Sequence, residues 1–270
     1  MVRRALGNHH LRPDTLLVTS DVVKQTDAVT DSVAEETEPH GELTGLVRRA
    51  RYVLFDFDGP ICRLFAGRPA DLIAREQVDW LDAQGLGEAL TAQERVDTDP
   101  HSALRSLGLQ RPRSDLVVEM EKRLTAEELR AVPTAWPTPY ADPLIRTWTA
   151  MGARLAITTN NSPEVARRYL EGRGLSGCFH PHVYGRTQDL TRLKPDPYCL
   201  HRALNAMGAA PASALMIGDT PTDYLASRAA GVEFLGYARN ERKAGLLRDA
   251  GARVLVGSLE PVLGALRAAR

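Results

Sequence analysis

Hydrophobic and polar positions along the chain alternate between short apolar runs and longer segments with helical spacing. The first clear apolar run covers residues 52–58 (YVLFDFD), ends in acids and is followed by Gly59-Pro60. A continuous apolar run that ends in polar groups is typical of a buried parallel strand. The Gly-Pro pair indicates that this strand stops there.

A helical pattern fills the next part of the chain, residues 66–132. Apolar residues recur near helical spacing over 70–84 and 116–129, and a shorter helical piece covers 101–107. We predict no strand in this region. The proline-rich segment 133–139 predicts an extended linker, because proline disfavours helix.

After the linker, predicted strands and helices alternate. The strands cover residues 154–158, 182–184, 214–217, 232–235 and 254–256. The helices cover residues 142–151, 162–172 with Ser162 as N-cap, 197–207 ending at Gly208, 222–230, 241–250 and 261–266. This alternation predicts an α/β fold, with a Rossmann-like parallel sheet and helices on both of its faces.

The first part of the chain carries no such periodicity. Residues 20–41 are rich in Thr, Asp and Glu, so we expect residues 1–45 to form a flexible N-terminal extension, with a short helix from about residue 42 leading into the domain. His9 and His10 are adjacent in this segment, and two solvated side chains are a simpler interpretation than a metal site.

Composition narrows the class of protein. Lys+Arg and Asp+Glu number 34 each, which gives no indication of nucleic acid or an acidic membrane as partner. No apolar run approaches the roughly 18 residues of a membrane span, and no signal peptide is recognisable. The three cysteines form no CxxC pair, which favours a reducing compartment, so we expect the cytoplasm.

Polar motifs stand where several predicted strands end or a helix begins. They are Asp56-Phe57-Asp58-Gly59, Thr158-Thr159-Asn160, Lys194-Pro195-Asp196-Pro197, and residues 218–223 (GDTPTD). Open α/β sheets place ligands at the carboxyl ends of their strands. Several carboxylates brought together need a cation, and Mg²⁺ prefers hard oxygen ligands. A hydroxyl, an amide and a lysine supply the donors that a phosphate needs.

In these motifs the chain resembles the haloacid dehalogenase superfamily. The order DxDG, Thr-Asn after a strand, Lys-Pro and GDxxxD is the four-motif signature of its phosphohydrolases, and the resemblance runs from about residue 51 to residue 256. The pattern is similar to the phosphoglycolate phosphatase and β-phosphoglucomutase-like subgroup. The resemblance implies hydrolysis of a small phosphorylated metabolite.

The resemblance also implies roles for individual residues. Asp56 would be the nucleophile that forms an aspartyl-phosphate, and Asp58 the general acid and base. Thr159 would bind the phosphoryl oxygens, with Asn160 beside it. Lys194 would neutralise the phosphoryl charge and orient Asp56.

The same resemblance implies a Mg²⁺ site. Its ligands would be the Asp56 side chain, the Asp58 backbone carbonyl and Asp219. Asp223 would act close by, either on the metal through water or on Lys194. Taken by itself, Asp223 could also be an acid favoured by the dipole of its helix.

An insertion between the first two motifs would form a helical cap over the site. We therefore expect residues 46–65 and 134–270 to form the core domain, and residues 66–133 an all-helical cap that excludes water and contributes specificity. Arg63, Arg68, Arg75 and His101 are candidates for substrate contact from this side. Pro60 departs from the Thr or Val that is commoner in the family, and we expect it to stiffen the turn.

Alternative functions stay open at this point. A haloacid dehalogenase would lack an acid at the position of Asp58, which favours phosphoryl transfer. A phosphomutase would keep every motif named above. A non-catalytic binding or regulatory protein is disfavoured by the intact set of Asp56, Asp58, Lys194 and Asp219.

Overall fold

A computed structural model describes residues 39–268 of the 270-residue chain. Most of the expected N-terminal extension, including His9 and His10, lies outside the described residues. Among residues 39–268, no helix combines the length and the apolar character needed to cross a bilayer.

Six parallel strands form the central sheet, in the order β5-β4-β1-β6-β7-β8. Their bounds are β1 Tyr52–Phe55, β4 Arg154–Thr158, β5 Val183–Tyr184, β6 Ala214–Gly218, β7 Glu233–Tyr237 and β8 Leu255–Val256. The central strand β1 pairs on both sides, with Phe55 opposite Ile157 of β4 and Ile217 of β6. The carboxyl ends of these three strands therefore meet at one edge, and the predicted parallel α/β sheet is confirmed.

The two faces of the sheet are covered by different helices. On β1, Val53 and Phe55 belong to one apolar cluster and Leu54 to another, as the two-residue period of a strand requires. The Leu54 face packs against α9 Tyr198–Met207, α10 Pro221–Ala229 and α11 Glu241–Ala250. The other face packs against α1 Pro39–Arg49, α6 Ala141–Ala150, α7 Pro163–Gly172, α8 Ser176–Phe179 and α12 Glu260–Ala268.

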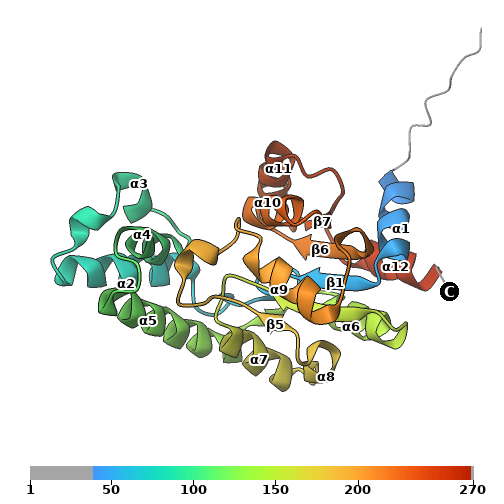
Figure 1. The fold of residues 1–270 in the computed structure, drawn as a ribbon, viewed down its shortest axis with the longest axis horizontal. Helices are drawn as coiled ribbons and strands as arrows, with labels where there is room; N and C mark the ends of the chain where they lie inside the picture. The colour runs from blue at the N-terminus through green and yellow to red at the C-terminus, as the bar shows by residue number, and fades with distance from the viewer. Residues whose placement is uncertain (1–38, 269–270) are drawn as a thin grey trace, which may run out of the picture. The chain divides into compact units, whose positions relative to one another are not determined.

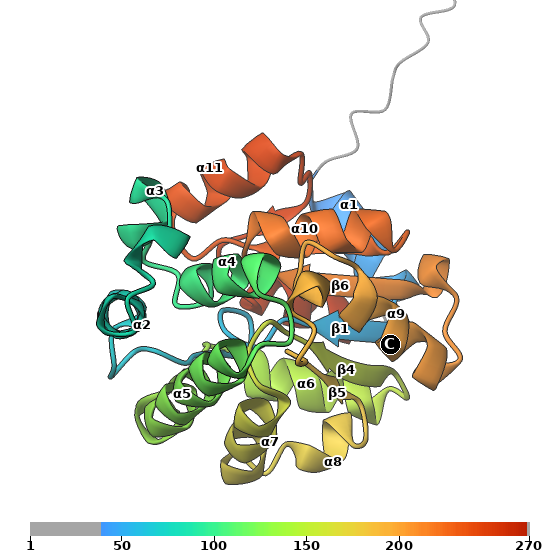
Figure 2. The same ribbon diagram turned by 60° about the vertical axis from the view of Figure 1, so that its left-hand side comes forward.

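Helices and the loops between them form the segment from residue 66 to residue 133, which we call the helical insert. Figure 1 shows it beyond the carboxyl ends of the strands, and Figure 2 shows α5 lying beside α4. The insert contains α2 Ala70–Ala83, α3 Ala92–Arg95, α4 Ser102–Gln110 and α5 Asp115–Ala131. It has its own apolar cluster, which Leu190 and Leu193 of the core also join.

The two chain crossings between core and insert lie side by side. Cys62–Arg63 (β2) pairs in antiparallel fashion with Trp136–Pro137 (β3). The prolines of residues 133–139 predict an extended linker but not this pairing, because two-residue strands carry no periodic signal. The guanidinium of Arg63 also lies over the ring of exposed Trp136, with 5.3 Å from Arg63 Cζ to the ring centroid.

The boundary that we predicted at residue 45 falls inside a helix. Helix α1 begins at Pro39, and Leu43, Leu46 and Val47 are buried in the main apolar cluster. These positions have the i, i+3, i+4 spacing of a helix face, and α1 contacts α12. Residues 39–45 therefore belong to the core rather than to an extension.

Candidate active site

The ammonium group of Lys194 lies at the centre of the site. Lys194 Nζ donates to Asp56 Oδ1 at 2.8 Å, to Asp223 Oδ1 at 2.5 Å and to the carbonyl oxygen of Thr158 at 2.9 Å. These acceptors use all three donors of the ammonium group. Burial favours the neutral amine, but the charges of Asp223 and Asp56 outweigh it and raise the pKa of Lys194 above its usual value.

Asp223 joins this site to the start of helix α10. Its Oδ2 accepts hydrogen bonds from the backbone N–H of Asp219 at 3.1 Å and of Thr220 at 3.0 Å, while Oδ1 receives Lys194. Thr220 completes a capping box with Asp223. A Cβ at Gly218 would lie 2.4 Å from Cβ of Asp223, so only glycine fits at the end of β6.

Asp219 faces the turn that follows Asp58. Its Oδ2 is paired with Lys243 of α11, and its Oδ1 is buried with no hydrogen-bond partner within residues 39–268. Gly59 has φ +128°, and a Cβ there would lie 2.3 Å from Cγ of Asp219. The glycine of the DxDG motif thus makes room for this carboxylate.

The acids of this edge fit a divalent cation. Asp56, Asp219 and Asp223 each offer a carboxylate oxygen, and these atoms lie within 4.8 Å of one another. The unpartnered Asp219 oxygen and the all-oxygen donor set suit Mg²⁺. The Asp58 side chain is not part of this group, because its Oδ1 accepts the Leu64 N–H at 2.8 Å.

Burial changes the acidity of both residues of the DxD pair. Desolvation raises the pKa of Asp56 to about 6, although Lys194 acts in the opposite direction. Desolvation also raises the pKa of Asp58, and the hydrogen bond from Leu64 opposes the rise. A carboxyl group with a raised pKa can hold and release a proton near neutral pH.

The loop of residues 159–162 follows β4. The Thr159 hydroxyl donates to Asn161 Oδ1 and accepts the Asn161 N–H, both at 3.1 Å. The Asn160 side chain accepts the Lys194 N–H at 2.8 Å and donates to the Lys194 carbonyl at 3.2 Å. The Asn160 side chain therefore fixes the backbone of Lys194. For a contact with phosphate, this leaves the backbone of Asn160. Ser162 precedes α7 as expected, but its side chain makes no capping hydrogen bond.

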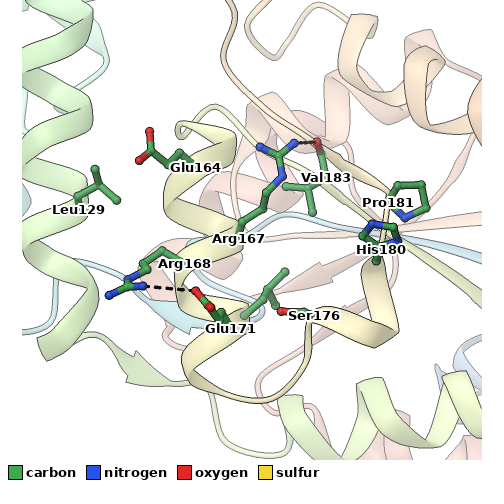
Figure 3. A pocket seen from close by; sticks show the side chains of 10 residues that line it. Leu129, Glu164, Arg167, Arg168, Glu171, Ser176, His180, Pro181 and Val183 are labelled. Carbon is green, nitrogen blue, oxygen red and sulfur yellow. Dashed lines mark hydrogen bonds and ion pairs between the residues drawn. The ribbon is translucent and has the colours of Figure 1, made fainter.

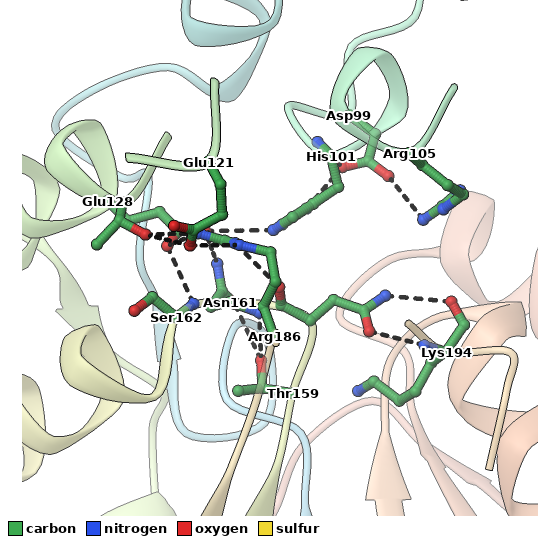
Figure 4. Close-up of polar contacts among 12 residues, drawn as sticks. Asp99, His101, Arg105, Glu121, Glu128, Thr159, Asn161, Ser162, Arg186 and Lys194 are labelled. Atoms are coloured by element: carbon green, nitrogen blue, oxygen red, sulfur yellow. Dashed lines mark hydrogen bonds and ion pairs between the residues drawn. The ribbon is translucent and has the colours of Figure 1, made fainter. Parts of the chain in front are cut away.

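The four substrate-contact candidates have different surroundings. Arg68 pairs with Glu76 and Glu127, and Arg75 pairs with Asp71 on the surface of the insert. Arg63 lies over Trp136. His101 is buried between Asp99 and Glu128, and Figure 4 shows its contact with Glu128.

Three charged residues near the site carry no signal in the sequence. Glu128 and Arg186 form a buried ion pair next to the 159–162 loop, and Lys243 pairs with Asp219. Glu128 is one of many acids on a charged helix, and Arg186 stands alone in a loop. Their partners are distant in sequence, so no local pattern indicates them.

A surface hollow of about 830 Å³ lies away from this chemistry. It is lined by residues of α5, α7, α8, β5 and the turn that joins α8 to β5, including Arg167, Arg168 and His180, and by none of the acids of the motifs (Figure 3). Arg167 donates to the Val183 carbonyl, and Arg168 pairs with Glu171. These cations therefore already have partners within the hollow.

Comparisons with known proteins identify the family of the chain. The family model described as haloacid dehalogenase-like hydrolase matches residues 50–231. A phosphoglycolate phosphatase of Rhodospirillum rubrum is 40% identical over 105 residues, 37% of this chain and 43% of that protein. The pyrophosphatase PpaX of Halalkalibacterium halodurans is 35% identical over 96 residues, 35% of this chain and 44% of that protein.

A solved structure supports the same fold. It is the structure of a HAD family hydrolase from Deinococcus radiodurans with bound phosphate and sodium. The two structures match with a TM-score of 0.54 and 24% sequence identity, over 82% of this chain and 97% of that one. The parallel sheet, its acidic carboxyl edge and the helical insert define an α/β protein with a Rossmann-like core. The chain belongs to the haloacid dehalogenase-like hydrolase family. It spans less than half the length of the two curated relatives named above.

Proposed function

We propose that the protein is a Mg²⁺-dependent phosphatase that hydrolyses a small phosphate monoester through an aspartyl-phosphate on Asp56. One observation carries the proposal: Lys194 lies between Asp56 and Asp223 at the edge where three carboxylates meet. This arrangement offers a nucleophile, a fixed cation and a set of metal ligands within one site.

The DxD pair supplies the covalent chemistry. A carboxylate oxygen of Asp56 attacks phosphorus, the bond from phosphorus to the ester oxygen breaks, and Asp58 gives its proton to the leaving alcohol. Asp58 then takes a proton from a water molecule, whose oxygen attacks phosphorus and releases phosphate from Asp56. The raised pKa of Asp58 supports its role as the acid of the first step.

Lys194 and the loop after β4 supply the electrostatics. Lys194 holds Asp56 in place and balances the charge of the phosphoryl group, since its ammonium is fully buried beside the nucleophile. The Thr159 hydroxyl and the backbone at Asn160 are the donors that we assign to the phosphoryl oxygens.

The Mg²⁺ would be held by Asp56, by Asp219, by the backbone carbonyl of Asp58 and, directly or through water, by Asp223. When bound, the ion neutralises the charge between an anionic nucleophile and an anionic substrate. The unpartnered Oδ1 of Asp219 supports this assignment.

The substrate that we propose is a small phosphorylated metabolite. Relatives named phosphoglycolate phosphatase and pyrophosphatase support this class. The helical insert lies at the carboxyl ends of the strands, where a cap would exclude water from the site (Figure 1). Three free thiols support a reducing compartment, and we place the reaction in the cytoplasm.

Phosphate release from a panel of monoesters, with and without Mg²⁺, tests the proposal. We expect Mg²⁺-dependent turnover by the wild type that Asp56→Asn abolishes. The matched control is Asp196→Asn, since Asp196 caps the turn before α9 at an exposed position. Turnover by Asp56→Asn equal to that of the wild type would refute the assignment of Asp56 as the nucleophile. Isomerisation of a sugar phosphate without net phosphate release would identify a phosphomutase instead.

A further inference from the structure

A buried carboxylate of the helical insert lies against the loop that follows β4. Glu128, near the end of α5, is 0% exposed, and its oxygens accept hydrogen bonds from five donor atoms. Two of them belong to the 159–162 loop: Asn161 Nδ2 at 3.0 Å and the Ser162 N–H at 3.1 Å. Helix α5 thus bonds directly to the segment to which we assign phosphate binding.

Arg186 binds the same carboxylate from the core. Its Nη1 lies 2.8 Å from Glu128 Oε1 and its Nη2 lies 3.0 Å from Oε2, which is a bidentate pair (Figure 4). Arg186 also holds the loop itself: Nη1 donates to the Asn160 carbonyl at 3.0 Å, and its backbone N–H donates to the Asn161 carbonyl at 2.9 Å.

Other residues of the insert complete the network. Glu121 and Thr125 lie on the same face of α5 as Glu128 and bind Arg186 at 3.1 Å and 2.8 Å. From the start of α4, His101 Nε2 lies 3.2 Å from Glu128 Oε1. The guanidinium of Arg186 therefore has several hydrogen-bond acceptors. A buried cation needs such partners, because it has lost its contacts with water.

The contacts extend to the proposed phosphate ligand. Asn161, which donates to Glu128, also accepts the hydroxyl hydrogen of Thr159 and donates its own N–H to that oxygen. The path from Glu128 through Asn161 to Thr159 therefore consists of hydrogen bonds between neighbours. A displacement of Asn161 would move the Thr159 hydroxyl.

We propose that Glu128 and Arg186 are positioning residues that hold the 159–162 loop in the conformation that binds the phosphoryl group. The inference rests on the proposed function, because it takes Thr159 and the backbone at Asn160 as phosphate donors. It adds that a residue of the insert shapes the phosphate site of the core without touching the substrate. A pre-set loop costs less free energy to order on binding, so its loss weakens binding.

Calorimetric titration of the full-length Mg²⁺-loaded protein with inorganic phosphate tests this inference. We expect Glu128→Gln to bind phosphate about 10- to 100-fold more weakly, because small errors in the placement of a binding group have effects of this size. Glu127→Gln is the matched control: the residue is adjacent on α5 but pairs with Arg68 and Arg130, away from the loop. We expect Glu127→Gln to bind phosphate as the wild type does.

A double variant separates positioning from folding. Glu128→Gln removes the bidentate carboxylate partner of buried Arg186 and leaves only Glu121 as its acid, which destabilises the protein, whereas Glu128→Leu with Arg186→Met replaces the pair by apolar groups. We expect the double variant to recover the unfolding midpoint of the wild type in urea but not its phosphate affinity. Recovery of both would show that the pair serves folding alone and would overturn the inference.

The remaining outcomes are also decisive. Wild-type phosphate affinity in Glu128→Gln would overturn the inference while leaving the proposed function intact. A wild-type protein that neither binds phosphate nor hydrolyses any ester of the panel would refute the proposed function, and the inference with it.

Discussion

Lys194 and Asp223 are 29 residues apart in sequence, yet Lys194 Nζ lies 2.5 Å from Asp223 Oδ1 at a site where both side chains are nearly inaccessible to solvent. The same ammonium group binds Asp56 Oδ1. One buried cation therefore contacts two buried carboxylates, and both depend on it as a counter-charge.

Replacing Lys194 tests this dependence. We expect Lys194→Met to lower the free energy of unfolding by about 3 kcal/mol or more, because two carboxylates lose their buried cation. We also expect turnover of the best ester to fall by about 10³-fold, since a fixed charge beside the phosphoryl group is lost. Urea unfolding and initial rates measure the two effects. The control is Lys122→Met, an exposed lysine on α5, which should leave both unchanged. Full activity in Lys194→Met would contradict the assigned role.

Lys243 would compete with a bound Mg²⁺ for the carboxylate of Asp219. The Lys243 ammonium is paired with Oδ2 of Asp219, a residue that we assign to Mg²⁺. Burial lowers the pKa of Lys243, although the nearby charges of Asp58 and Asp56 oppose this effect. We expect Lys243→Met to bind Mg²⁺ about threefold to tenfold more tightly in calorimetry, because a competing cation is removed. Arg242→Met, at the neighbouring exposed position of α11, is the control. Weaker Mg²⁺ binding in Lys243→Met would show that the lysine supports the metal site instead.

Most of the residues that the structure brings together at this edge of the sheet could be predicted from the sequence, because each motif is local. Asp56 and Asp58 follow one apolar run and Asp219 follows another, and parallel strands bring such ends to one edge. The structure shows that Asp223 contacts Lys194 directly, one of the two roles that the sequence left open.

What could not be predicted depends on contacts between distant segments. Glu128 and Arg186 are separated by 58 residues, and neither lies in a recognisable motif. The Asn160 side chain binds the backbone of Lys194, 34 residues away. The side chain of a residue expected at the phosphate therefore holds the lysine segment instead. The helix expected from about residue 42 begins at Pro39, because residues 39–41 carry no apolar periodicity that would indicate its first turn.

His101 gives the protein a stability that depends on pH. Burial disfavours its imidazolium, but the charges of Asp99 and Glu128 and their hydrogen bonds outweigh burial and raise the pKa to about 9 from 6.5. Because the folded pKa is higher than the unfolded one, the stabilisation is fully present below pH 6.5 and is lost as pH rises through 9. Between pH 6.5 and 9.5 we expect the free energy of unfolding of the wild type to fall by up to about 3 kcal/mol relative to that of His101→Gln, because each pH unit contributes about 1.4 kcal/mol. Urea unfolding of both proteins across this range measures the difference. A difference that is constant with pH would show that His101 is neutral in the folded state.

Gly59 leaves space for the carboxylate of Asp219, to which we assign Mg²⁺, and a single methyl group tests this relationship. A Cβ at this position would lie 2.3 Å from Cγ of Asp219, and φ is +128°, a conformation that side chains rarely adopt. We expect Gly59→Ala to displace Asp219, to weaken Mg²⁺ binding by at least about tenfold, and to destabilise the protein by about 2 kcal/mol or more. Gly85→Ala is the matched control, since Gly85 also has a positive φ of +71° but has open space around its Cβ position. It should show only the backbone strain of about 1 kcal/mol and normal Mg²⁺ binding. Calorimetry and urea unfolding measure both effects, and equal Mg²⁺ affinity in the two variants would mean that Asp219 does not hold the ion.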